Sequence, residues 1–260
     1  MTAGGTDAAL LQRIEAYFDA APRPAADVEQ HGPLTLFVSR IPWRYYGRPR
    51  MGLSPRDAVR AEDVRALRAR QRELGVREAL EWVHETTPSL AEAAAAAGMA
   101  VQMVPLLAAP VDAIAAPAGV PGVTLRMLGA DDPALVPSQD AVEVAFGGVP
   151  GLTSEESVAF LRARIANGLT GVGVAEAGGE VVGGGSHQPV GSVSEIMSVG
   201  VVPAERGRGI GSALTALLAG DARASGATLV LISAADDRVA ALYERVGFRR
   251  VGTTCFGRAA

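Results

Sequence analysis

The stretch VVPAERGRGIGSAL, residues 201–214, decides how the second half of the chain is interpreted. It begins as a β-branched run, reaches a proline, and then places Gly207, Gly209 and Gly211 among arginine and isoleucine. From Ile210 onward the apolar residues recur with helical spacing. The sequence therefore predicts a tight turn from a strand into the N-terminus of a helix. Backbone N–H groups without an intrahelical acceptor can surround a phosphate group there.

Two common phosphate-binding motifs are excluded. The P-loop needs a lysine after its second glycine, and the sequence contains no lysine. The dinucleotide motif G-x-G-x-x-G needs its third glycine at the position of Ser212. The glycines of this turn remove Cβ atoms, and Arg206 and Arg208 add positive charge. At this point both a phosphate site and a plain structural turn remain open.

The composition allows one large domain or two smaller ones. The chain has 260 residues, of which 48% are hydrophobic and 20% charged. Its net charge of -4 does not favour nucleic acid or an anionic membrane as a partner. The segment IPWRYYGRPR, residues 41–50, interleaves aromatic residues with arginines. In an acidic chain we interpret it as packing with local cation–π contacts.

The sequence gives no support for metal chemistry. Cys255 is the single cysteine, and His31, His84 and His187 lack the spacing of a metal site. Residues 1–22 predict an amphipathic helix rather than a signal peptide, and no apolar stretch is long enough to predict a membrane span. We therefore expect a cytoplasmic protein that binds no metal.

A proline-rich connector divides the chain. The segment LLAAPVDAIAAPAGVPGVTL, residues 106–125, has no clear period, and the expected domains are 1–118 and 119–260. After this boundary the sequence predicts a strand, helices, three antiparallel strands, a helix, a strand, a helix and a strand. This order indicates an α+β layout.

The last part of this order also occurs before the boundary. Residues 63–107 predict a helix, a strand, a helix and a strand, and we interpret this as an internal repeat in a tandem arrangement. A coincidence of two α/β stretches is the alternative. Aligning Gly98 with Gly247 places Ala94 opposite Tyr243, and no R-x-x-G-x-G run precedes Ala94. We expect the N-terminal half to have the scaffold without the chemistry.

A second motif lies further along the chain. The sequence AALYERVGF, residues 240–248, predicts a helix that begins after Asp236 or Asp237 and ends at Gly247. Together with V-x-P-x-x-R-G-x-G-I-G at residues 201–211, it resembles the paired acetyl-CoA motifs of the GNAT (Gcn5-related N-acetyltransferase) superfamily. The resemblance covers the C-terminal half, and the N-terminal half resembles a degenerate GNAT-like domain. It implies an α+β fold with a mixed, mostly antiparallel sheet flanked by helices.

The resemblance implies where acetyl-CoA binds. The motif R-x-x-G-x-G is carried by Arg206, Gly209 and Gly211. The pyrophosphate would be held by the backbone amides of Gly207, Arg208, Gly209, Ile210, Gly211 and Ser212. The pantetheine would run along the preceding strand and pair with the backbone of Val199 and Val201. A backbone N–H of that strand would polarise the acetyl carbonyl.

The resemblance also implies a general acid. Tyr243 matches the residue that protonates the departing thiolate, and it also shares the apolar face of its helix with Val239 and Val246. Packing within that face is therefore the alternative role for Tyr243. Asp236 stands where many relatives have an asparagine that contacts the cofactor, and capping of the helix is its alternative role.

A general base is implied on the strand before the turn. Glu195 lies eleven residues before Arg206, where histone-type members of the superfamily carry a glutamate. Simple alternation places Glu195 on one strand face with Met197, Val199 and Val201. Burial there would raise the pKa of the carboxylate, so that it accepts a proton. A solvated glutamate with no catalytic role, and a base supplied by His187 or water, are the alternatives.

These inferences predict an acetyl-CoA-dependent N-acetyltransferase that acetylates a primary amine by direct attack in a ternary complex. The expected acceptor is a small-molecule amine or a protein amine, and homodimer formation is left open. The alternative is a non-catalytic acyl-CoA-binding or sensing module, because Asp236 places negative charge near an anionic cofactor.

Overall fold

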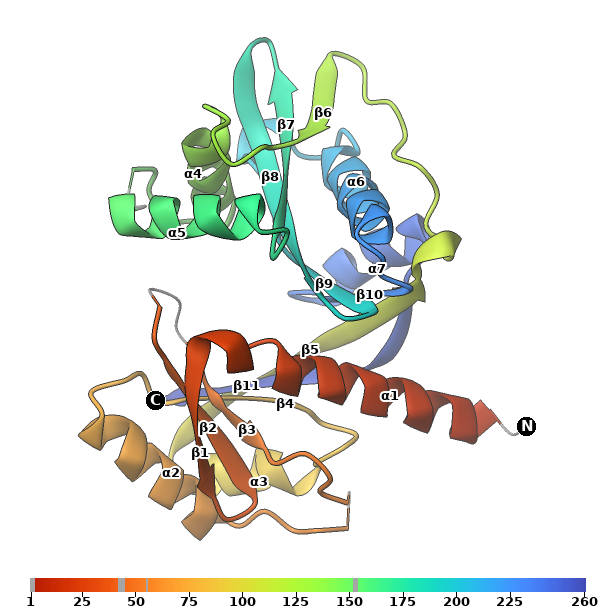
Figure 1. The fold of residues 1–260 in the computed structure, drawn as a ribbon. Coiled ribbons are helices and arrows are strands. Elements are labelled where there is room, and N and C mark those ends of the chain that lie inside the picture. Colours follow the sequence, from red (N-terminus) through yellow and green to blue (C-terminus); the bar gives the residue numbers. More distant parts are fainter. Residues whose placement is uncertain (1–2, 42–44, 55, 152–153) are drawn as a thin grey trace. The chain divides into compact units, whose positions relative to one another are not determined.

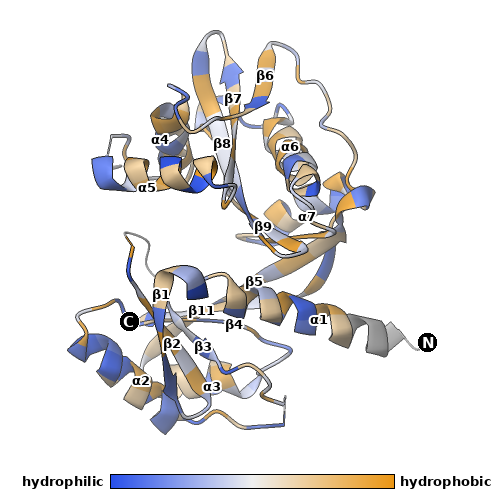
Figure 2. Cartoon of the chain, in the orientation of Figure 1, coloured by the Kyte–Doolittle hydropathy of each residue, from blue (hydrophilic) through white to orange (hydrophobic). Residues whose placement is uncertain are grey.

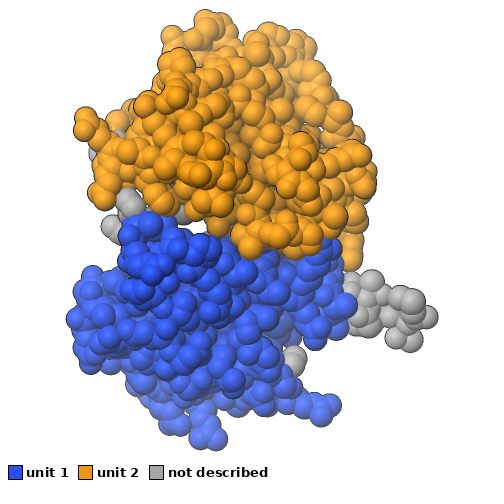
Figure 3. Space-filling model, in the orientation of Figure 1, with its two compact units in different colours: residues 1–106, 251–260 blue, residues 107–250 orange. Residues whose placement is uncertain are grey.

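The chain divides into two compact units. The computed structural model describes residues 3–41, 45–54, 56–151 and 154–260. Unit 1 comprises residues 1–106 and 251–260, and unit 2 comprises residues 107–250 (Figure 3). The expected division into domains 1–118 and 119–260 stays a prediction. The compact units differ from this division in that the last ten residues belong to unit 1.

The described residues of unit 1 form three α-helices and a sheet (Figure 1). Its elements are α1 (Ala3–Ala20), β1 (Ala26–His31), β2 (Leu34–Ser39), β3 (Gly47–Pro49), α2 (Ala61–Glu73), β4 (Ala79–Val83), α3 (Ser89–Ala96), most of β5 (Met99–Pro110) and most of β11 (Arg249–Ala259). The strand order is β1-β2-β3-β4-β11-β5. Among the described residues, β3 and β4 pair in parallel through Gly47 and Leu80, and β11 pairs antiparallel with β4.

Helices cover both faces of the sheet of unit 1. Leu67 of α2 lies against Gly47, where a Cβ would approach a leucine methyl to 2.3 Å. Arg48 therefore points to the opposite face, where its buried guanidinium pairs with Glu15 of α1 and lies 5.8 Å from the centre of the Phe18 ring. This contact confirms local cation–π packing for the arginine at position 48, whereas residues 42–44 of the same segment lie outside the described residues.

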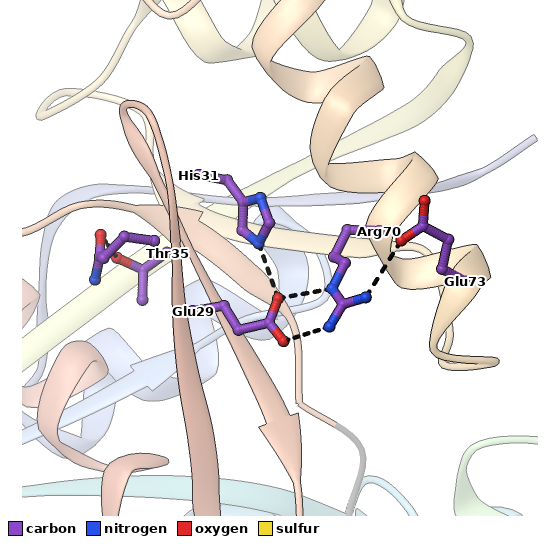
Figure 4. A network of polar contacts seen from close by, with 6 residues as sticks. Glu29, His31, Thr35, Arg70 and Glu73 are labelled. Atoms are coloured by element: carbon purple, nitrogen blue, oxygen red, sulfur yellow. Dashed lines mark hydrogen bonds and ion pairs between the residues drawn. The ribbon is translucent and has the colours of Figure 1, made fainter.

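A polar network joins the first strand to α2 (Figure 4). Glu29 of β1 accepts two hydrogen bonds from Arg70, each 2.9 Å long, and its carboxylate lies 3.0 Å from His31 Nε2. Arg70 also contacts Glu73 at 3.2 Å. The network lowers the pKa of Glu29 to about 2, because the hydrogen bonds from Arg70 favour the carboxylate. The predominantly hydrophilic α2 (Figure 2) is thus tied to the sheet edge by charge as well as by its buried leucine.

Unit 2 contains the glycine-rich stretch of residues 201–214. Its elements are β6 (Val123–Met127), α4 (Leu135–Ala145), α5 (Glu155–Ala166), β7 (Gly171–Ala177), β8 (Glu180–Val190), β9 (Val193–Val201), α6 (Ile210–Ala224), β10 (Leu229–Ser233) and α7 (Asp237–Val246). β6, β7, β8 and β9 pair antiparallel in that order, β10 pairs parallel with β9, and the end of β5 lies beside β10.

The sheet of unit 2 lies between two pairs of helices (Figure 1). On one face Leu135 of α4 and Leu161 of α5 pack against Val172 and Val174 of β7. On the other face α6 and α7 share a buried apolar cluster with the sheet. The fold is therefore a mixed α+β arrangement with a mostly antiparallel sheet flanked by helices, as predicted. In the described part of the chain, no helix is long and apolar enough to cross a membrane.

Candidate functional site

The glycine turn between β9 and α6 presents an open helix N-terminus. Gly207 and Gly209 have φ angles of 81° and 87°, a region that glycine enters without steric cost. A Cβ added at either position would meet nothing within 4 Å, so the backbone faces open space. Gly209 is the N-cap of α6 and has no side chain to occupy the first N–H groups. The N–H groups of Ile210, Gly211 and Ser212 are therefore available to an anion.

The two arginines of this turn, Arg206 and Arg208, form hydrogen bonds with neighbouring segments. Arg206 donates from Nε to the carbonyl of Val201 at 3.1 Å and from Nη2 to the carbonyl of Ala145 at 2.7 Å. Arg208 donates to the carbonyl of Pro121 at 2.7 Å and pairs with Glu205. Arg206 thereby joins the turn to the C-terminal end of α4. Both guanidinium groups keep their positive charge beside the open N–H groups.

A β-bulge interrupts β9 at Ser198. Met197 pairs with Ser186 and Gly200 pairs with Gly184, so β9 has one more residue in this interval than β8. Ser198 has a φ of 56° and is the one residue other than glycine with a positive φ in the described part of the chain. Strained backbone of this kind persists where the surroundings hold it, and it concentrates at functional sites.

Because of this bulge, Glu195 does not lie on the strand face that simple alternation predicted. Ile196 packs with residues of α6, so its neighbour Glu195 faces the opposite side of the sheet, toward α4 and α5. Val199 and Val201 pack against Ile210 of α6. Glu195 and Met197 therefore do not share a face with Val199 and Val201, contrary to the prediction. The physical reason is the extra residue at the bulge, which reverses the alternation of the strand.

The pairing between β9 and β10 ends before β9 reaches the glycine turn. Their parallel register joins Val193–Glu195 to Leu229–Leu231, and it extends no further among the described residues. Val202 donates its N–H to Val182 of β8 at 2.9 Å. Because successive residues of a strand point to opposite edges, the N–H and C=O of Val201 face the edge toward β10. The Val201 C=O accepts the hydrogen bond from Arg206, so this arrangement leaves the N–H of Val201 and the edge groups of Val199 for a ligand.

Tyr243 lies on α7 with a buried ring and an accessible hydroxyl. α7 begins after Asp236, whose side chain accepts the N–H of Val239 at 2.8 Å, and ends at Gly247 with a φ of 121°. The Tyr243 ring lies 6.2 Å from the Phe248 ring. In the described part of the chain its hydroxyl has no hydrogen-bond partner, yet it is not one of the fully enclosed polar atoms. Burial raises the pKa of Tyr243 to about 12, so the phenol keeps its proton near neutral pH.

Asp236 and Glu195 have different surroundings. The exposed Asp236 caps α7, which is the alternative role considered from the sequence, and its contact with a cofactor stays a prediction. Glu195 is half-buried and is the last residue of β9 in the described register with β10, opposite Leu231, while Gln188 of β8 lies on its other side. Its carboxylate thus lies where the two strands begin to separate.

His187 is neither a surface histidine nor a neighbour of Glu195. Its buried ring lies 2.9 Å from Ser194 Oγ through Nδ1 and 2.8 Å from Asp221 Oδ2 through Nε2. Gly171 makes room for this contact, because a Cβ there would lie 2.2 Å from Nε2. Asp221 belongs to α6, so His187 faces away from Glu195 and joins the sheet to α6. Pairings of this kind, far apart in sequence, have no local sequence signal.

Sequence reasoning also missed the end of α4. Gly200 of β9 lies so close to it that an added Cβ would be 2.7 Å from Ala145 Cβ and 3.6 Å from Phe146 Cε2. The signal that could have revealed the approach is the pair of strand glycines, Gly184 and Gly200, because glycine inside a strand often marks a close approach.

Comparison with known proteins identifies the second half of the chain. Residues 146–248 match the sequence model of the acetyltransferase (GNAT) family. The C-terminal half is therefore a GNAT domain, as its paired motifs predicted. A search of curated proteins found no match.

Solved structures extend the likeness over most of the chain. A GCN5-related N-acetyltransferase from Kribbella flavida has a TM-score of 0.74 and 20% identity, over 96% of each chain. One from Sphaerobacter thermophilus has a TM-score of 0.56 and 25% identity, over 70% of this chain and 59% of that one. A tandem GNAT protein from the clavulanic acid biosynthesis pathway has a TM-score of 0.55 and 18% identity, over 87% and 78%. The first and third likenesses establish the fold.

Proposed function

We propose that this chain is an acetyl-CoA-dependent N-acetyltransferase that acetylates a primary amine by direct attack in a ternary complex. One observation carries the proposal: a single strand, β9, ends in an open anion-binding turn and separates from β10 just before it. The turn at Gly207–Ser212 suits the pyrophosphate of acetyl-CoA. The edge groups of Val199 and the N–H of Val201 suit the amide-bearing pantetheine arm.

The proposed reaction balances with the groups of unit 2. The neutral amine nitrogen attacks the thioester carbonyl carbon, forming a C–N bond, and the C–S bond then breaks. The nitrogen loses one proton, and the departing thiolate gains one to give free CoA thiol. Tyr243 supplies the proton to sulfur, because its phenol is protonated near neutral pH and has no hydrogen-bond partner in the described part of the chain.

Glu195 is the proposed acceptor of the amine proton, directly or through water. It is half-buried at the point where β9 and β10 separate, and it faces the side of α4. His187 does not suit this role, because both ring nitrogens contact side chains on the α6 side of the sheet. This leaves water as the alternative base.

A combined assay tests the proposal. Release of free CoA thiol is followed with Ellman's reagent across a panel of primary amines, and acetyl-CoA binding is measured by calorimetry. We expect binding together with turnover of at least one amine. Binding without turnover across the panel would favour the alternative, an acyl-CoA-binding or sensing module. The absence of both would reject the proposed function.

A further inference from the structure

An uncharged apolar segment follows the middle of α4. From Val144 to Ser154 the sequence VAFGGVPGLTS has no charged residue. The large apolar side chains exposed in the described part of the chain are Val28, Met51, Met103, Val136, Phe146, Val149 and Leu169. Phe146 and Val149 are the most exposed of these, at 65% and 63%. Two such side chains within one turn indicate a surface that a ligand or partner covers.

This apolar surface borders the candidate transfer site. Phe146 Cε2 lies 3.6 Å from the position of a Cβ on Gly200, two residues beyond the bulge at Ser198. The carbonyl of Ala145, next to Phe146, accepts the hydrogen bond from Arg206 of the glycine turn. Gly200 faces α4, and so does Glu195 on the other side of the bulge. The apolar surface and the proposed base therefore lie on the same face of β9.

Of the charged groups near this turn, Asp140 and Arg206 form hydrogen bonds, and Glu143 is exposed. Asp140 accepts the N–H of Gly151 at 2.7 Å. Glu143 folds back over the same turn, where its Oε2 lies 2.7 Å from the position of a Cβ on Gly148. The Arg206 guanidinium is held by two carbonyl groups. A phosphorylated amine would need a free arginine beside this surface, whereas an apolar group needs none.

We infer that the acceptor is a primary amine carried on an alkyl or aryl group, which packs against Phe146 and Val149 while its nitrogen reaches toward Glu195. The inference rests on the proposed function and names the substrate class of that site. Burial of an aromatic or aliphatic side chain of this size is worth about 1.5–3 kcal/mol, enough to favour an apolar acceptor by about tenfold or more.

The test compares matched amines. Values of kcat/KM are measured for 2-phenylethylamine, ethanolamine and spermidine by release of CoA thiol. We expect 2-phenylethylamine to be preferred over ethanolamine by at least about tenfold. The Phe146→Ala variant should lose about tenfold for 2-phenylethylamine and little for ethanolamine, with an unchanged acetyl-CoA dissociation constant. Leu169→Ala is the control, because Leu169 is also exposed in unit 2 but lies between α5 and β7.

The outcomes separate this inference from the proposed function. Preference for ethanolamine or spermidine, or an equal loss for all amines in Phe146→Ala, would overturn the inference while leaving the acetyltransferase proposal intact. Sedimentation velocity gives a second readout. If Phe146→Ala lowers the assembled mass and leaves the amine preference unchanged, the surface is a subunit interface and the inference is wrong. If no amine is acetylated, both proposals fail.

Discussion

In unit 1 the helix α2 follows β3, and in unit 2 the helix α6 follows β9. The two helices differ in how the backbone N–H groups of their first turns are capped. In unit 2, Gly209 leaves the first N–H groups of α6 open. In unit 1, the backbone N–H of Arg60 donates to the Asp63 carboxylate at 2.9 Å, and Glu62 adds a second acidic group to the first turn of α2. Negative charge there stabilises the helix and repels a phosphate. Of these two helix starts, that of α6 leaves N–H groups open to the anion that the proposed function requires.

The side chains near the two parallel strand pairs, β3 with β4 in unit 1 and β9 with β10 in unit 2, also differ. In unit 2 the phenol of Tyr243 reaches accessible space. In unit 1 the repeat places Ala94 at the equivalent position, and it is fully buried. The buried Arg48 of β3 pairs with Glu15 of α1. Unit 1 therefore has a parallel strand pair and helices, with a buried alanine and a buried ion pair in place of an accessible phenol.

The largest expected effect tests the acid that unit 1 lacks. Tyr243→Phe should lower kcat by about 100-fold, because positioned proton transfer contributes roughly that much or more. Acetyl-CoA affinity should remain, since the ring still packs against Phe248. Tyr17→Phe, at a buried tyrosine of unit 1, is the matched control and should leave kcat unchanged. Equal kcat values for Tyr243→Phe and wild type would show that the phenol has no role as the acid.

The next effect tests the uncapped helix start. Gly209→Ala should weaken acetyl-CoA binding by about tenfold, because a Cβ strains the left-handed backbone and projects into the open anion site. Gly226→Ala is the matched control, since Gly226 has a φ of 91° just beyond the other end of α6 and nothing lies within 4 Å of its added Cβ. Calorimetry on both variants separates lost binding from lost stability. Equal affinities in the two variants would place the pyrophosphate elsewhere.

The sequence was sufficient for the features that local chemistry determines. The alternation of β7, β8 and β9, the helical spacing from Ile210, and the stop of α7 at Gly247 all predicted the observed elements. These features depend on residues a few positions apart, where spacing and propensity are informative. The internal repeat stays a prediction.

The remaining features depend on residues that are distant in sequence. The bulge at Ser198 adds one residue to a regular strand pattern, so the face of Glu195 was predicted incorrectly. The contact between His187 and Asp221 spans 34 positions. The pairing of β11 with β4 joins the chain end to unit 1. Tertiary packing selects each of these, and no local pattern encodes them.

A smaller effect distinguishes structure from catalysis at His187. Ser194→Ala should lower the free energy of unfolding by about 1–2 kcal/mol, because it leaves the buried Nδ1 of His187 without its partner. The kcat value of the folded variant should stay close to wild type, since this contact lies on the face opposite Glu195. Urea denaturation and the thiol-release assay measure the two quantities. A large fall in kcat with unchanged stability would instead place His187 in the reaction.

The smallest effect concerns the charged network of unit 1. The pKa of Glu29 is lowered from 4.5 to about 2, so the folded state binds this proton less readily than the unfolded chain. Its stabilising contribution is therefore present above pH 4.5 and is lost as the pH falls toward 2. Because Glu29 is 30% exposed, solvent screening limits the contribution to less than about 1 kcal/mol.

The variant Glu29→Gln isolates this contribution. Its free energy of unfolding should lie below that of wild type at pH 7, and the difference should shrink between pH 4.5 and pH 2 in urea denaturation. Glu73→Gln is the control, because Glu73 contacts the same Arg70 from a more exposed position and should cost less. Acetyl-CoA affinity at pH 7 should be unchanged in both variants, since unit 1 holds the network and unit 2 holds the open helix start. A pH-independent difference would mean that Glu29 acts through packing rather than charge.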